Sequence, residues 1–152
     1  MDPHRFAYDF SVRLHDTDAA GRLFFGHLFR HAHDAYEAFM AQVGHPLERL
    51  IREGEILLPL VHAEADYHRP LGQGDRVQVA LAIEEIRARS FAVAYRFETE
   101  DGALAATAKT VHLQINRDGS PASGLSDGIR EAIRPFLHAR PQPAGGPTGQ
   151  DG

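Results

Sequence analysis

Residues 27–43 read HLFRHAHDAYEAFMAQV, and this stretch decides the fold class. Its apolar residues recur at steps of three and four, so they form one stripe along a helix of about four turns. These residues are Leu28, Ala32, Ala35, Tyr36, Phe39, Met40 and Val43. Gly44 and Pro46 end the helix, because neither residue continues helical backbone well. The sequence therefore predicts a long helix with an apolar face that another layer must cover.

The segments around this helix follow the two-residue period of strands. Residues 6–14 are short and rich in aromatic and branched side chains, which favours a first strand. Apolar residues alternate with polar or small ones over 77–84 and 91–97, as in strands with one buried face. Glycine-containing turns, rather than helices, separate the later strands, so we expect mostly antiparallel pairing. The predicted fold class is α+β, with an antiparallel sheet and one central helix.

The length of 152 residues suits a single domain. We predict that residues 1–138 form it, with a short helical turn near 47–52 and a last helix over 125–137. Residues 139–152 have no apolar anchor and are rich in Gly and Pro, so they are predicted to be a disordered tail.

Composition excludes several function classes. The chain has 16 basic and 21 acidic residues, and the resulting net charge of −5 argues against general nucleic-acid binding. No apolar run approaches the roughly 20 residues that cross a bilayer, and no secretory signal is visible. We therefore predict a cytoplasmic protein with neither a nucleic-acid nor a membrane partner. The absence of cysteine excludes thiolate nucleophiles and cysteine-based zinc sites. A serine hydrolase is disfavoured because no Gly-x-Ser-x-Gly motif occurs.

The predicted sheet carries more large apolar side chains than one helix is expected to cover. Phe91 and Phe97 alternate with smaller residues on a strand that could lie at a sheet edge. A partner subunit is one way to bury such a surface, so we expect an oligomer.

The polar run before the helix, HDTDAAG at 15–21, holds the candidate chemistry. Asp16 and Asp18 could cap the helix or stabilise a turn, as carboxylates near a helix start often do. Alternatively, free amides near Phe25 and Gly26 could bind a substrate carbonyl oxygen while an aspartate attacks the carbon or activates water. The residue types alone leave both interpretations open.

DTDAAG at 16–21, followed by Phe24, Phe25 and a helix, resembles the active-site segment of hot-dog-fold acyl-CoA thioesterases of the 4-hydroxybenzoyl-CoA thioesterase type. The resemblance covers about residues 5–137 and includes LPLV at 58–61, ADY at 65–67 and IRARSF at 86–91. Within that family, DAAG at 18–21 followed by HDAYE at 33–37 is most similar to the 1,4-dihydroxy-2-naphthoyl-CoA hydrolases of phylloquinone and menaquinone synthesis.

The resemblance implies a hot-dog fold, an antiparallel sheet wrapped around a long central helix. It implies hydrolysis of an acyl-CoA thioester to free CoA and a carboxylic acid, without a metal or organic cofactor. The acyl-CoA would lie at the subunit junctions of a homodimer or homotetramer. The catalytic carboxylate falls on Asp18, as nucleophile or as general base, and the amide that polarises the carbonyl falls on Phe25, with Gly26 adjacent.

For the CoA phosphates, the resemblance indicates the turn that holds Arg87, Arg89 and Ser90. Arginine suits phosphate because its fork donates parallel hydrogen bonds, although an ordinary solvated turn would look the same. His33 either lies near the substrate or is a packed or exposed histidine. The chain departs from the family at Phe25, where many relatives have tyrosine or histidine. It also departs at Arg22, a position where relatives usually have a small apolar residue. The family pattern therefore does not predict the shape of the acyl pocket.

His27, His31 and Asp34 share a helix flank at a spacing that can bind a metal ion. The zinc-hydrolase pattern with an intervening Glu is absent, so we expect a polar flank opposite the apolar stripe, or a lining near the active site, and no metal.

Two further functions stay open at the level of the sequence. A broader thioesterase would act on short-chain or benzoyl-type acyl-CoA. A hot-dog domain without catalytic activity would only bind an acyl group, although the presence of Asp18 in the family's motif argues against it.

Overall fold

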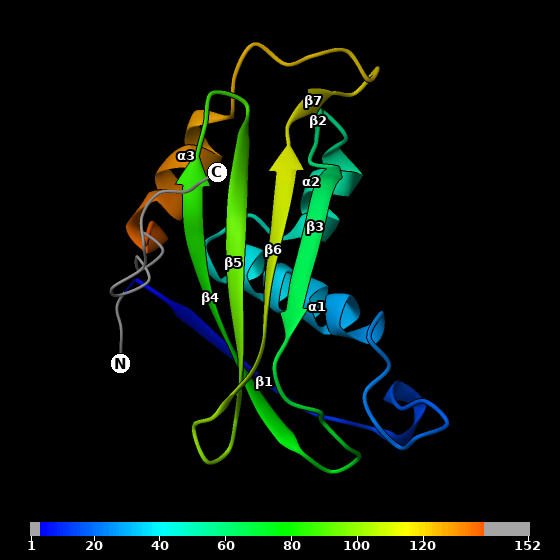
Figure 1. Ribbon diagram of the computed structural model, residues 1–152. Coiled ribbons are helices and arrows are strands. Elements are labelled where there is room, and N and C mark those ends of the chain that lie inside the picture. The colour runs from blue at the N-terminus through cyan, green and yellow to red at the C-terminus, as the bar shows by residue number, and fades with distance from the viewer. Residues whose placement is uncertain (1–3, 139–152) are drawn as a thin grey trace, which may run out of the picture.

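A five-stranded antiparallel sheet curves around one long helix in the computed structural model, which describes residues 4–138 (Figure 1). The strand order across the sheet is β1 (Phe6–Ser11), β4 (Arg76–Ile86), β5 (Ser90–Thr99), β6 (Leu104–Leu113) and β3 (Leu60–Tyr67). A small second sheet pairs β2 (Ile56–Leu57) with β7 (Ile115–Asn116). The helices are α1 (His27–Gln42), α2 (Leu47–Glu53) and α3 (Asp127–Ile133), with single 3₁₀ turns η1 (Leu14–Asp16) and η2 (Arg134–Phe136).

This architecture confirms the predicted α+β class and the antiparallel pairing. The first strand is shorter than predicted and ends at Ser11, because the chain turns into η1. The predicted last helix is divided into α3 and η2. The tail predicted over 139–152 lies outside the described residues. No helix between residues 4 and 138 has the length and apolarity that a membrane crossing requires.

The core lies between α1 and the concave face of the sheet. Leu28, Phe39 and Met40 of α1 are fully buried, as the predicted stripe requires. Phe91 and Phe97 are also buried, because β5 is the central strand: the Phe91 ring lies against Tyr36 of α1, and the Phe97 ring against Phe10 of β1. The expectation that these two phenylalanines could lie at an edge and need a partner was therefore wrong.

The uncovered apolar surface lies instead on β3, the last strand of the sheet. Seven of its eight residues are exposed, among them Leu60, Val61 and Tyr67. One side of β3 pairs with β6, and its other side pairs with no strand of the part that the structure describes. An exposed edge with apolar side chains is a surface that natural proteins usually cover.

A chain of buried polar groups crosses the inner face of the sheet. The hydroxyl groups of Tyr95 and Thr110 are 2.8 Å apart, and Thr110 Oγ1 lies 3.0 Å from His112 Nε2. The Tyr36 ring stacks on the His112 ring with centroids 4.1 Å apart. Burial, assisted by the nearby His33, lowers the pKa of His112 to about 4, against an opposing hydrogen bond with the Leu58 backbone. His112 is therefore neutral near pH 7.

This burial predicts acid sensitivity. An unfolded-state histidine titrates near pH 6.5, so between pH 6.5 and 4 the unfolded chain binds a proton at His112 that the folded protein excludes. The free energy of unfolding should fall by about 3 kcal/mol over this window through His112 alone, at about 1.4 kcal/mol per pKa unit. Urea unfolding at a series of pH values measures it. His112→Gln should show a correspondingly smaller loss; equal losses in both proteins would contradict the assignment.

Candidate active site

The segment between η1 and α1 closes on itself. The Phe24 amide donates to the Asp16 carbonyl at 2.9 Å, and Thr17 and Leu23 form a bridge just inside that bond. The Asp18 amide donates to the Arg22 carbonyl at 2.8 Å. We call residues 16–24 the Asp18 loop. These bonds join the first and last residues of the loop to each other. Asp18, within the loop, and α1, which follows it, are therefore both connected to this hydrogen-bonded closure.

The Asp18 side chain is exposed at the tip of this loop. Its Oδ1 accepts hydrogen bonds from the amides of Ala20 at 2.8 Å and Arg22 at 3.2 Å. Its Oδ2 accepts none from the residues that the structure describes. Asp18 therefore has the predicted turn role through one oxygen and leaves the other open to a ligand. It does not cap α1, whose N-cap is Gly26 without any side-chain cap.

The two amides just before α1 are also free. Within residues 4–138, neither the Phe25 nor the Gly26 N–H donates a hydrogen bond, whereas the neighbouring His27 amide donates to the Phe24 carbonyl at 2.9 Å. Phe25 is 64% exposed and Gly26 is half-buried, so this segment lies near the surface. Unpaired amides at the positive end of a helix dipole suit an oxygen atom that carries or develops negative charge.

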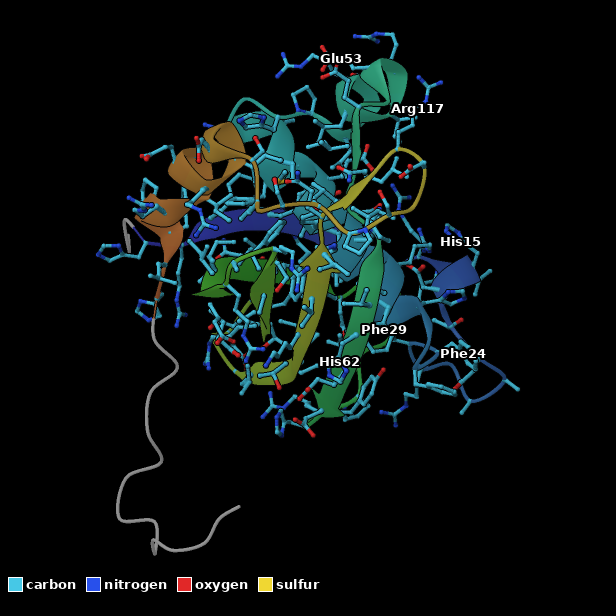
Figure 2. The ribbon with its side chains drawn as sticks, turned by 90° about the horizontal axis from the view of Figure 1, so that it is seen from above. His15, Phe24, Phe29, Glu53, His62 and Arg117 are labelled. Carbon is cyan, nitrogen blue, oxygen red and sulfur yellow. The ribbon has the colours of Figure 1, made fainter. Side chains whose placement is uncertain are left out.

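Two contacts from the sheet side hold this region in place. The Tyr67 hydroxyl at the end of β3 donates to the Phe25 carbonyl, and the Leu23 amide donates to the Leu71 carbonyl at 2.7 Å. Figure 2 shows His15 and Phe24 on the same projecting side of the molecule. No sequence pattern indicates the Tyr67 contact, because it depends on where the edge strand ends relative to α1.

A cavity of about 330 Å³ adjoins the loop. Leu23, Leu28 and Leu71 give it apolar walls, and Tyr67 and Arg22 also line it. Its volume is in the range of small-molecule sites. Arg22, the residue that departs from the family pattern, therefore contributes directly to the pocket beside Asp18.

Arg87, Arg89 and Ser90 lie at the opposite end of the sheet. The segment before β4 contacts the segment before η1, with the Gly74 amide donating to the Val12 carbonyl at 2.8 Å. From there β4 runs for 11 residues to the turn that holds both arginines, which is about 30–35 Å of strand (Figure 1). Arg87 and Ser90 share a small cavity, and Arg87 Nε is paired with Glu85 at 2.8 Å. One chain therefore does not bring these cations to Asp18.

His33 and the histidines considered for a metal site lie apart from one another. His33 is exposed on α1, with its ring 5.7 Å from that of Tyr36. His31 is buried, stacked on Phe10 with centroids 3.9 Å apart, so the expectation of a polar flank was wrong for this residue. Its Nε2 lies 3.2 Å from the Asp16 carboxylate without hydrogen-bond geometry, and burial lowers the pKa of His31. In the described part of the chain, no three His, Asp or Glu side chains are placed to hold a metal ion.

Comparison with known proteins shows which family the chain belongs to. The sequence pattern of the thioesterase-like superfamily matches residues 12–133. The chain belongs to this superfamily. A 1,4-dihydroxy-2-naphthoyl-CoA hydrolase of Rippkaea orientalis is 35% identical over 129 residues, which are 84% of this chain and 94% of that protein. The corresponding hydrolase of a Picosynechococcus species is 39% identical over 116 residues, covering 73% of this chain and 80% of that protein.

Solved structures agree. The crystal structure of a 1,4-dihydroxy-2-naphthoyl-CoA thioesterase from Synechocystis superposes with a TM-score of 0.81 at 34% identity, covering 86% of this chain and 96% of that one. A gentisyl-coenzyme A thioesterase superposes with a TM-score of 0.76 at 26% identity, covering 85% and 99%. The predictions of a hot-dog fold and of an acyl-CoA thioesterase are confirmed.

Proposed function

We propose that this thioesterase hydrolyses 1,4-dihydroxy-2-naphthoyl-CoA to free CoA and the corresponding carboxylic acid. The observation that carries the proposal is the Asp18 carboxylate, which has one unpaired oxygen and lies on a loop that closes next to the free amides of Phe25 and Gly26, just before α1. The named activities of the Rippkaea and Synechocystis relatives support the acyl group. The gentisyl-coenzyme A thioesterase makes a smaller aromatic acyl group the second candidate.

In the proposed reaction, the thioester carbonyl oxygen accepts a hydrogen bond from the Phe25 amide, with Gly26 adjacent. Negative charge develops on that oxygen as the carbonyl carbon is attacked, and one such donor stabilises it by about 3 kcal/mol. Two routes use this geometry. Asp18 attacks the carbon, expels the CoA thiolate and forms an anhydride that water then cleaves, or Asp18 removes a proton from the water that attacks.

The acyl group is proposed to occupy the cavity beside the loop. Leu23, Leu28 and Leu71 offer an apolar surface for an aromatic ring, and Arg22 offers a hydrogen-bond donor for a ring hydroxyl. This arrangement favours hydroxylated aromatic acyl groups over aliphatic chains.

The CoA phosphates are proposed to bind Arg87 and Arg89 of a second copy. If the free edges of two β3 strands pair antiparallel, the Tyr67 end of one strand lies beside the Leu60 end of the other. The Leu60 end is near the β4–β5 turn, because His62 lines the same small cavity as Arg87 and Ser90. A homodimer of this kind, alone or within a tetramer, covers the exposed strand and brings the partner's turn toward the Asp18 loop.

Asp18→Asn tests the chemistry. Loss of the carboxylate removes both nucleophile and base while the amide side chain still accepts the turn hydrogen bonds, so turnover should fall by at least about 10³-fold with an unchanged fold. Release of free thiol from 1,4-dihydroxy-2-naphthoyl-, benzoyl- and aliphatic acyl-CoA measures both the loss and the substrate preference. Asp9→Asn, an exposed carboxylate on β1, is the control and should keep full activity. An active Asp18→Asn protein would refute the role, and equal efficiency on all three substrates would refute the proposed acyl group.

Arg89→Ala tests the CoA site. Removing a charge-assisted phosphate contact should raise KM about tenfold and leave kcat nearly unchanged, whereas Arg52→Ala on α2 should change neither. Because the site is proposed to use two chains, mixing Arg89→Ala with inactive Asp18→Asn subunits should restore a low KM in part of the population. An unchanged KM in Arg89→Ala would exclude the phosphate contact, and a mixture that keeps the high KM would exclude the shared site.

A further inference from the structure

The proposed mechanism leaves one buried carboxylate unused. Asp16 is fully buried at the base of the Asp18 loop. Its Oδ2 accepts a hydrogen bond from the Arg13 amide at 2.8 Å and lies 3.2 Å from His31 Nε2, and its Oδ1 contacts the Arg30 guanidinium. A buried carboxylate is costly unless it is paired and hydrogen-bonded, and here both oxygens have partners.

These partners come from two different elements. Arg13 precedes η1, whereas Arg30 and His31 belong to the first turns of α1. The backbone of Asp16 adds a third connection, because its carbonyl accepts the Phe24 amide that closes the loop. Asp16 therefore joins the start of the loop, the end of the loop and the helix.

The helix side of this connection is held firmly. The His31 ring lies flat on the Phe10 ring of β1, with an interplanar angle of 8°, and its Nε2 is 3.2 Å from Asp16 Oδ2, although the pair lacks hydrogen-bond geometry. Burial raises the pKa of Asp16, but the Arg13 amide, His31 and Arg30 together outweigh it and hold that pKa below its ordinary value. The carboxylate is thus charged at neutral pH, and its ion pair with Arg30 is maintained.

Asp18 and Phe25 extend from the two ends of this connection. Asp18 is two residues beyond Asp16, and Phe25 directly follows Phe24. Any movement of the loop against α1 therefore changes the separation between the Asp18 carboxylate and the Phe25 amide.

We propose that Asp16 is a positioning residue, whose buried carboxylate sets this separation by tying the Asp18 loop to α1 through Arg30 and His31. The inference rests on the proposed function, and it assigns Asp16 no contact with substrate. A displacement of about 1 Å between reacting groups can cost about 100-fold in rate, so the role has a measurable size.

Asp16→Asn tests it. The side-chain amide of asparagine has the same shape as the carboxylate, but its NH₂ group takes the place of one acceptor oxygen. That NH₂ donor would then face another donor, either the Arg13 amide or the Arg30 guanidinium. We expect kcat to fall about 10- to 100-fold while KM changes less than about twofold, because binding does not depend on the separation. Ile133→Ala, in the buried face of α3, is the control for lost stability and should keep its kcat below the melting temperature. A kcat in Asp16→Asn no lower than in this control would overturn the proposal.

Arg30 supplies an independent test if Asp16→Asn does not fold. Arg30→Lys keeps the positive charge and should retain more of kcat than Arg30→Met, which has a similar length and no charge; equal losses would overturn the proposal. Failure of the positioning role and failure of the proposed function are distinguishable. Full activity in Asp16→Asn with none in Asp18→Asn removes only the positioning role, whereas full activity in Asp18→Asn removes the proposed mechanism itself.

Discussion

Burial of one face of α1 is the constraint on which the site depends. Leu28, Phe39 and Met40 are fully buried in the core, where Phe39 contacts both Phe6 of β1 and Phe136 of η2, and this packing fixes the position of the helix. A helix fixed in this way also fixes the segment just before it. The amides of Phe25 and Gly26 in that segment donate to no group of residues 4–138, whereas the first amides of α1 itself are paired, beginning with that of His27. The proposed mechanism uses these two amides, and no dedicated side chain, to bind the carbonyl oxygen. A rigid scaffold that holds a reactive loop is a common arrangement in enzymes.

Asp16 and Asp18 show how environment separates two identical side chains. They are two residues apart, yet the first is fully buried and the second is exposed. The first contacts the Arg30 guanidinium, accepts a hydrogen bond from the Arg13 amide and lies 3.2 Å from His31, and its burial leaves neither oxygen at the surface. The second holds its turn through one oxygen and keeps the other available. The sequence spacing of the two aspartates does not show which one is buried and paired and which one has a free oxygen. Their contacts in the structure show it.

The sequence predicted those features that depend on local periodicity or on a motif. The helix stripe, the alternating strands and the polar loop before the helix all belong to this group, and the family resemblance selected Asp18 and the Phe25 amide. The features that the sequence did not predict depend on the tertiary arrangement. A period of two residues does not reveal that β5 is central and β3 is the edge, so the exposed surface was expected at Phe91 and Phe97 instead of Leu60 and Val61. The contacts of His31 and Tyr67 likewise join segments far apart in the chain.

In the proposed mechanism, a thioester carbonyl lies between the Asp18 carboxylate and the start of α1. A crystal structure with a ketone analogue of 1,4-dihydroxy-2-naphthoyl-CoA, in which CH₂ replaces the sulfur, tests this position directly. We expect the carbonyl oxygen about 2.7–3.1 Å from the Phe25 nitrogen, with the carbonyl carbon facing the open oxygen of Asp18. A carbonyl group bound elsewhere, with water in the space between Asp18 and Phe25, would contradict the mechanism.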